Sequence, residues 1–244
     1  MILPSDSILR NPPQVISPKQ ILVFNAIRYS IDICEISFNR LMDNLDEFDK
    51  GDPPTEFTIP NIFLDVWSVI NNSVIFMKII CREFQISPNE KALAEIKKAK
   101  DLRDSNQHID ERLREKILSN ELPVYGRLNW RNHKGNNKAF YATLLYSGTF
   151  TSKEKISMTI SNRTDVTKLI GNINMLEFSD IIREKIGKKW IFREESVVLD
   201  QIMADLKKWI QFFDEQVNEQ LKDHISAKRH LSDLVLELGP IETK

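Results

Sequence analysis

The stretch PKQILVFNAIRYSIDICEISFNRLMDNLDEFDK, residues 18–50, decides the fold. Apolar side chains recur in it every three or four residues, and most of its charged side chains fall between them. This spacing is typical of a long helix that buries one face. Ser17 and Pro18 provide an N-cap and a first-turn proline, and Gly51 provides a C-cap. The sequence therefore predicts one helix over the whole stretch.

Two more helices are expected after this stretch. The first begins near Thr58 and is apolar around more than half of its circumference as far as Phe84, which suits a central position in a bundle. The next begins at Ser87, where Glu90 three residues later completes a capping box. It carries much more charge and ends at Pro123.

From residue 124 the pattern changes from a helical to a strand period. The segments 124–130, 138–150 and 154–161 are rich in β-branched and aromatic residues and are separated by turn residues. They predict three antiparallel strands in a meander. The segment 164–193 fits both helix and strand, and we expect a mixed structure there with a helix near Phe178–Ile186.

A clear helical period returns at Ser196 and continues to Leu221, followed by a shorter helical tail that ends near Leu238. The predicted fold is mainly α, a long-helix up-and-down bundle with a small antiparallel β insert, or α+β overall. The predicted parts are an irregular N-terminal segment at 1–17, a bundle formed by 18–122 and 195–238, and a β-containing insert at 123–194.

The formal charge of the 244-residue chain is −1, but its distribution is uneven. Residues 121–163 contain seven basic and two acidic side chains, a balance of +5, and aromatic residues lie among these charges. A basic surface with aromatic side chains can bind RNA through phosphate contacts and base stacking. The candidates for RNA contact are Arg127, Arg131, Lys134 and Lys138. The aromatic residues also fit the buried side of a small sheet.

Several classes of site are absent from the sequence. It contains no P-loop, no dinucleotide-binding glycine motif and no GxSxG nucleophile motif. The four histidines and two cysteines show no zinc spacing, so we expect neither a metal nor a cofactor. The N-terminus has no signal-peptide core, and polar residues interrupt the apolar stretch 59–84. We therefore expect a cytoplasmic protein without a membrane span.

One short motif in the third helix points to a function. In the segment RDSNQH, four residues lie between Arg103 and His108, and Asp104 directly follows the arginine. This resembles the signature of the HEPN superfamily, all-helical domains with an R-x(4–6)-H motif and a polar residue after the arginine. The two preceding amphipathic helices add to the resemblance. Many members use this motif as a metal-independent RNase site in a homodimer cleft, and some belong to toxin or phage-defence systems.

The resemblance implies a homodimeric endoribonuclease. Histidine moves protons near neutral pH, and arginine binds phosphate through several donors. We expect His108 to transfer the proton, Arg103 to bind the phosphate and Asp104, one helical turn before His108, to orient the imidazole. Because Arg103 and His108 point about 140° apart on a helix of ~3.6 residues per turn, two copies would face each other to form the composite site.

Two other interpretations remain open. The charged motif also fits an ordinary solvated helix face, in which case the protein is a non-catalytic binding or assembly module whose basic insert contacts RNA or a protein partner. A weaker option is a partner of a nucleotidyl-transfer enzyme, a role found in parts of the superfamily.

Overall fold

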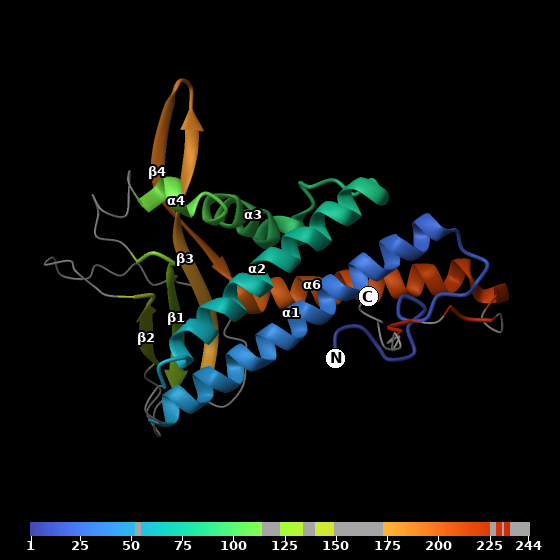
Figure 1. The fold of residues 1–244 in the computed structure, drawn as a ribbon, viewed down its shortest axis with the longest axis horizontal. Coiled ribbons are helices and arrows are strands. Elements are labelled where there is room, and N and C mark those ends of the chain that lie inside the picture. Colours follow the sequence, from blue (N-terminus) through green and yellow to red (C-terminus); the bar gives the residue numbers. More distant parts are fainter. Residues whose placement is uncertain are drawn as a thin grey trace, which may run out of the picture.

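Two long antiparallel helices, α1 and α2, lie side by side across a four-stranded sheet in the computed structural model (Figure 1). The structure describes residues 1–51, 55–113, 123–133, 140–148, 173–224, 228–230 and 232–234. The helices are α1 (Pro18–Lys50), α2 (Thr58–Glu83), η1 (Lys91–Leu93), α3 (Ala94–Asn106), α4 (Ile109–Arg112), α6 (Leu199–Gln220) and η3 (Lys222–His224). The strands are β1 (Arg127–His133), β2 (Phe140–Tyr146), β3 (Ile173–Ile186) and β4 (Lys189–Val198).

The limits of α1 agree with those predicted from its caps. The Ser17 side chain accepts from the backbone N–H of Gln20, and the Gln20 side chain accepts from the N–H of Ser17 (2.9 Å), which completes a capping box. Gly51 follows with φ +91°, a left-handed conformation that glycine adopts without strain. The first helix is therefore confirmed at both ends.

The central helix of the fold is α2, which packs between α1 and α3. It is long and apolar enough to cross a membrane, but 61% of its most apolar window is buried within the fold. Trp67 on α2 meets Phe178 of β3 edge-to-face, with ring centroids 5.1 Å apart. On the neighbouring helix, Phe48 meets the fully buried Trp130 of β1 at 6.2 Å. These aromatic pairs join the helical layer to the sheet in one core.

The sheet has the strand order β2-β1-β3-β4, and every neighbouring pair is antiparallel. The first two predicted strands correspond to β1 and β2, whereas the third, at 154–161, lies outside the described residues. A bulge interrupts the pairing of β1 with β3, because Trp130 pairs with Leu176 and Arg131 pairs with Asn174. The extra residue is Met175, whose φ of +45° lies in the left-handed region.

The predicted helix near Phe178–Ile186 is wrong, because this segment belongs to strand β3. The first eight residues of β3, from Ile173 to Asp180, are all buried, so both faces of this part of the strand are covered. A strand with one exposed face alternates apolar and polar residues, but a strand that is buried on both faces does not. Its continuous apolar run resembles that of a buried helix.

The third predicted helix is also shorter than expected. Ser87 does not start it; a 3-10 turn precedes α3, which begins at Ala94 and ends at Asn106. The last long helix begins at Leu199, close to the predicted start at Ser196. It packs against β3, and Asp200 in its first turn accepts from Leu176 N (3.0 Å).

These strands change the fold class. The prediction of a long-helix bundle with a small β insert is wrong, because the four-stranded sheet is a full layer of a mixed α+β fold. Residues from both halves of the sheet, such as Leu128 and Phe178, belong to the same core cluster as the residues of α1, α2 and α6. The division into N-terminal segment, bundle and insert stays a prediction.

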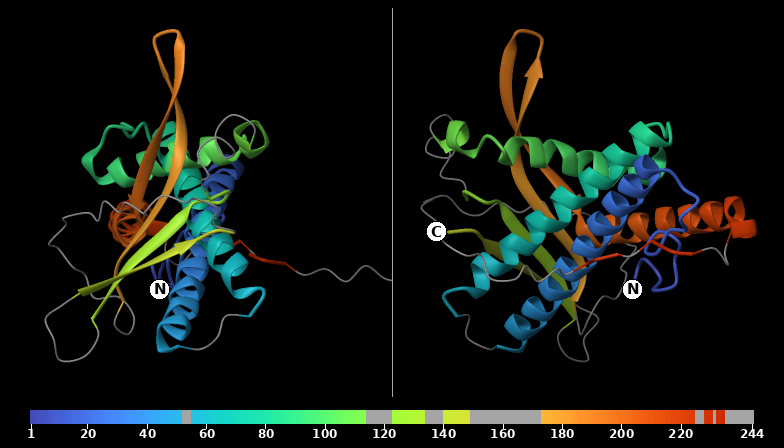
Figure 2. Two further views of the ribbon diagram at one scale, coloured as in Figure 1. Left: turned by 90° about the vertical axis from the view of Figure 1, so that its left-hand side faces the viewer. Right: turned by 45° about the vertical axis from the view of Figure 1, so that its right-hand side comes forward.

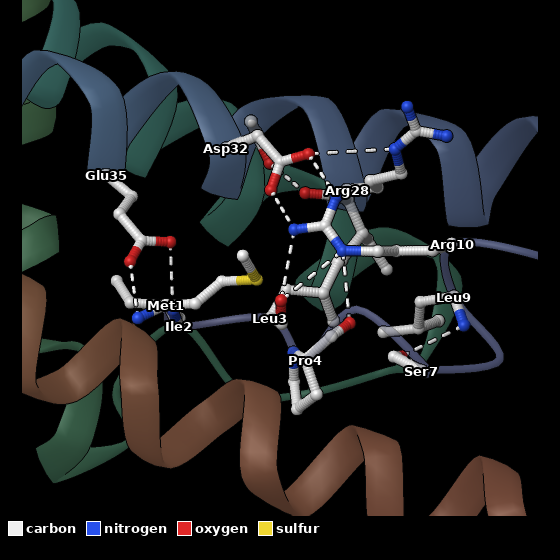
Figure 3. Close-up of polar contacts among 12 residues, drawn as sticks. Met1, Ile2, Leu3, Pro4, Ser7, Leu9, Arg10, Arg28, Asp32 and Glu35 are labelled. Carbon is white, nitrogen blue, oxygen red and sulfur yellow. Dashed lines mark hydrogen bonds and ion pairs between the residues drawn. The ribbon is translucent and has the colours of Figure 1, made fainter. Parts of the chain in front are cut away.

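The N-terminal segment belongs to the core through Leu3, Ile8 and Leu9. Arg10 holds this segment in place. Its two terminal nitrogens donate to the carboxylate of Asp32 on α1 at 2.7 and 2.6 Å, and it also donates to the carbonyl oxygen of Leu3 (Figure 3). One guanidinium therefore ties the turn of the N-terminal segment to the long helix.

The β3–β4 hairpin is the most prominent feature of the outline. Its inner part lies in the sheet, and its outer part extends beyond the helices (Figure 1; Figure 2, both views). The C-terminal ends of α3 and the short helix α4 lie beside it, and the space between them contains the candidate site.

Candidate functional site

The candidate motif does not lie on one continuous helix. α3 ends at Asn106 and α4 begins at Ile109, so His108 lies in the turn between them. There its backbone N–H donates to the carbonyl oxygen of Ser105 (3.3 Å). A separation of four residues places Asp104 beside His108 only within an unbroken helix, and the spacing alone therefore no longer puts them on one face.

The carboxylate of Asp104 is engaged by two cations of its own helix. Lys100 Nζ donates to Oδ2 (2.8 Å), and Arg103 Nη1 donates to Oδ1 (3.2 Å). The hydrogen bond to Asp104 raises the pKa of Lys100 above its ordinary value. One turn earlier, burial raises the pKa of the Asp101 carboxyl. Arg103 itself is mostly covered, with 18% of its side chain exposed.

Among the three predicted catalytic residues, His108 is the most accessible, with 66% of its side chain exposed. Its Nδ1 lies 3.8 Å from Oε1 of Glu111 on α4. The other oxygen of Glu111 lies 3.5 Å from Nη1 of Arg183 on β3. One carboxylate therefore links the motif to the hairpin, and the imidazole remains open to a bound molecule.

A groove of about 620 Å³ lies between α3, α4 and the β3–β4 hairpin. This volume is within the range of ligand sites in proteins. Its helical wall is polar and consists of Asp101, Asp104, Ser105, Gln107, His108 and Glu111. Its hairpin wall is basic and aromatic and consists of Ile182, Arg183, Glu184, Lys185, Trp190, Phe192 and Arg193. The groove thus brings two of the three predicted catalytic residues together, whereas Arg103 is not among the described residues that line it.

Charge pairing is strong along the hairpin wall. Arg193 donates from Nε to Glu184 (2.7 Å) and from Nη1 to Glu195 (2.5 Å), and these bonds raise the pKa of its guanidinium. The guanidinium carbon of Arg183 lies 4.3 Å from the ring centroid of Trp190, a cation–π geometry. The indole ring is therefore held beside a cation at the edge of the groove.

Two of the four residues predicted to contact RNA lie within the described part of the chain. Arg127 begins β1 and forms an ion pair with Glu194 of β4. Arg131 lies on the same strand beside the bulge. Neither residue lines the groove. Lys134 and Lys138 lie outside the described residues.

Sequence reasoning missed the basic and aromatic residues of the hairpin because it predicted a helix there. A signal for the hairpin was available. Gly187 and Lys188 form a two-residue loop between the paired residues Ile186 and Lys189. Gly187 has φ +62°, as the favoured two-residue hairpin turns require, and a glycine between two runs of β-branched and aromatic residues indicates this turn.

Within the described ranges, no group of three or more His, Cys, Asp or Glu side chains is arranged to hold a metal ion. Comparison with known proteins gives no match to a family model, to a curated protein or to a solved structure.

Proposed function

We propose that the protein is a metal-independent endoribonuclease of HEPN type that acts as a homodimer with a composite site of Arg103 and His108. The 2′-hydroxyl oxygen attacks the adjacent phosphorus and the P–O5′ bond breaks, which leaves a 2′,3′-cyclic phosphate and a 5′-hydroxyl. His108 accepts the proton of the 2′-hydroxyl and then donates it to the leaving O5′, Arg103 stabilises the negative charge on the phosphorane, and Asp104 is the orienting residue.

The observation that carries this proposal is the position of His108. Its imidazole is two-thirds exposed and lines a groove whose opposite wall carries Arg183 and Arg193. A phosphodiester in this groove would have a proton-transfer group on one side and cations on the other. That arrangement suits cleavage of an anionic chain better than it suits an ordinary solvated helix end.

The composite part of the proposal concerns Arg103. Within one chain this residue is bound to Asp104 and does not line the groove with His108. In the homodimer, the second copy supplies Arg103 to the site that contains His108 of the first. Two identical half-sites are then formed, as two-fold symmetry requires.

Cleavage of labelled RNA in excess EDTA tests the enzyme. We expect wild type to cleave, and His108→Ala to be slower by about 10²–10⁴-fold, the usual contribution of a general acid or base. His224→Ala is the matched control, because His224 is also an exposed histidine but lies on η3. Equal rates for wild type and His108→Ala, or loss of cleavage in EDTA, would contradict the proposal.

Mixing two inactive variants tests the composite site. If Arg103 and His108 come from different chains, a heterodimer of Arg103→Ala and His108→Ala contains one intact site and one doubly altered site. Random exchange of subunits then restores about a quarter of the wild-type activity. If both residues act within one chain, every site stays defective and mixing restores nothing.

A second candidate function is a non-catalytic assembly protein, and an exposed stripe on α1 favours it. Leu22, Tyr29, Ile33 and Ile36 are 70%, 51%, 38% and 62% exposed and follow a seven-residue repeat, the spacing of a coiled-coil seam. An antiparallel second copy would pair Leu22 with Ile36 and Tyr29 with itself.

Because α2 lies between α1 and α3, that pairing would keep the two α3 helices apart (Figure 1). Light scattering separates the two functions. A dimer that Ile36→Asp dissociates, in a protein that does not cleave RNA, would support assembly. An active dimer that Ile36→Asp leaves intact would support the composite enzyme.

A further inference from the structure

The β3–β4 hairpin changes character along its length. At its base, Phe178 pairs with Val197 and both are fully buried. At its tip, Ile186 pairs with Lys189, and every residue from 185 to 190 is exposed. This tip extends past the helices in each view of the molecule (Figures 1 and 2). The buried base of the hairpin therefore presents the exposed tip to solvent at the end of an antiparallel ladder.

The tip carries uncompensated positive charge. Lys185, Lys188 and Lys189 form no ion pair with any residue in the described part of the chain. The nearest carboxylates along the ladder are already engaged, because Glu184 binds Arg193 and Glu194 binds Arg127. Three lysines thus remain available to a polyanion.

An aromatic ring lies beside these lysines. Trp190 is 51% exposed, pairs in register with Lys185 and has the guanidinium carbon of Arg183 4.3 Å from its ring centroid. An exposed indole next to a cation is the arrangement on which an unpaired base stacks. Trp190 also lines the groove that contains His108, so a chain bound at the tip has a direct path to the imidazole.

We propose that the hairpin tip is a binding site for single-stranded RNA, with a base stacked on Trp190 and phosphates bound by Lys185, Lys188 and Lys189. A single strand fits better than a duplex, because stacking on a side chain requires an unpaired base. RNA fits better than a lipid surface, because Ile186 and Trp190 are the only large apolar side chains exposed at the tip and three lysines surround them. Delivery of the strand to His108 rests on the proposed function, whereas binding at the tip does not.

The test measures binding in the His108→Ala protein, which leaves the RNA uncut. The probe is a short fluorescein-labelled single-stranded RNA, and fluorescence anisotropy gives the affinity across a salt series. The double variant Lys188→Gln with Lys189→Gln should make the negative slope of log K against log [salt] shallower by about 1.4, since each phosphate contact with a single strand contributes about 0.7 to its magnitude. The matched control is Lys207→Gln with Lys208→Gln, which removes two exposed lysines of α6.

The stacking contact has its own variants. Trp190→Leu should weaken binding roughly tenfold, and Trp190→Phe should retain most of the affinity. Circular dichroism checks that each variant is folded, as expected for half-exposed or exposed positions. The same hairpin variants assayed against duplex RNA should show a much smaller change.

The results of these binding experiments distinguish the proposed RNA site at the hairpin tip from the proposed endoribonuclease activity. Tip-dependent RNA binding in a protein that does not cleave supports the site and contradicts the enzyme. Cleavage by wild type, with unchanged binding in the hairpin variants, contradicts the site and supports the enzyme. Equal effects of the hairpin and α6 variants, equal loss for duplex RNA, or binding to vesicles of anionic phospholipid without RNA binding would each overturn the site.

Discussion

The carboxylate of Asp65 on α2 is completely buried and receives the guanidinium of Arg40 on α1. The Nε of Arg40 donates to both oxygens, at 3.0 and 2.9 Å, and Nη2 also donates to Oδ1. These hydrogen bonds raise the pKa of Arg40. The guanidinium is half exposed, whereas the carboxylate is not exposed at all. Among the described residues, Arg40 is the only cation paired with this buried charge.

Removing the arginine alone should therefore be costly. We expect Arg40→Met to lower the free energy of unfolding by about 3 kcal/mol, since it leaves a buried carboxylate unpaired. Arg40→Met with Asp65→Leu should recover most of that loss. Urea denaturation measures all three proteins, and Arg82→Met, at an 87% exposed arginine of α2, is the control with a change below about 0.5 kcal/mol. A single variant as stable as wild type would show that the pair does not stabilise the fold.

Two glycines with similar backbones should respond differently to alanine. Gly126 has φ +87°, and a Cβ there would lie 2.5 Å from a ring atom of Phe178 and 2.8 Å from the carbonyl oxygen of Ser179. Gly148 has φ +83°, and no heavy atom of the described residues lies within 4 Å of a Cβ built there. We expect Gly148→Ala to cost about 1 kcal/mol from backbone strain, and Gly126→Ala to cost about 2 kcal/mol more from the clash. Thermal and urea unfolding measure the difference, and equal losses would contradict the close packing of Phe178 against Gly126.

The buried thiol of Cys34 should make stability depend on alkaline pH. Burial raises the pKa of Cys34 well above the ordinary value. Below the pKa of the thiol in the unfolded chain, Cys34 is protonated in both the folded and the unfolded state, so its contribution to the free energy of unfolding does not change with pH. Above that pKa, the thiol loses its proton in the unfolded chain but keeps it in the folded one, so the free energy of unfolding falls by up to about 1.4 kcal/mol per pH unit as the pH rises.

The variant Cys34→Ala isolates this effect. It is less stable at pH 7, but its loss of stability above pH ~9 should be shallower than that of wild type, because the lysines and tyrosines titrate in both proteins. A thiol reagent gives a second measurement, since Cys81 is only partly buried and should react first. Parallel pH curves for the two proteins would rule out the effect.

Acid should release the segment that contains Asp233 from α1. Tyr29 donates to Asp233 (2.7 Å) and Arg28 also binds it, and these hydrogen bonds lower the pKa of the Asp233 carboxyl. The contact is therefore present above the pKa of the unfolded carboxyl and is lost as the pH falls through the lowered folded value. Hydrogen exchange of residues 228–230 should accelerate at that pH.

At neutral pH, Asp233→Asn should reproduce the release. Trypsin should then cut faster after Lys228 and Arg229 than in wild type, and Asp223→Asn on η3 is the matched control. Unchanged cleavage in Asp233→Asn would show that other contacts hold the segment.

The sequence predicts those parts of the fold whose signals are local. The caps Ser17 and Gly51 define α1 because their hydrogen bonds involve only nearby residues. The inner part of β3 could not be predicted in this way, because its eight buried residues owe their pattern to partners far along the chain. The end of α3 before His108 is similar, since the side chain of Ser105 in its last turn donates to Ile181 O of β3 (2.9 Å), a partner far along the chain.

The same distinction applies to the candidate site. The spacing of the motif predicts Asp104 and His108 as site residues, and both line the groove. The opposite wall was not found, because Arg183 and Trp190 acquire their positions only when β3 and β4 pair. A motif can therefore be recognised on one element, whereas the surface that faces it depends on the fold.

The long ladder of β3 and β4 also has a mechanical consequence. Because Phe178 is buried and Ile186 is exposed on the same strand, we expect amides near Phe178 to exchange only by global opening and amides near Ile186 to exchange by local fraying. A molecule that binds the outer end should slow exchange progressively inward along the strand. Binding at the tip of the hairpin would then be detectable as slower amide exchange at the buried base of β3.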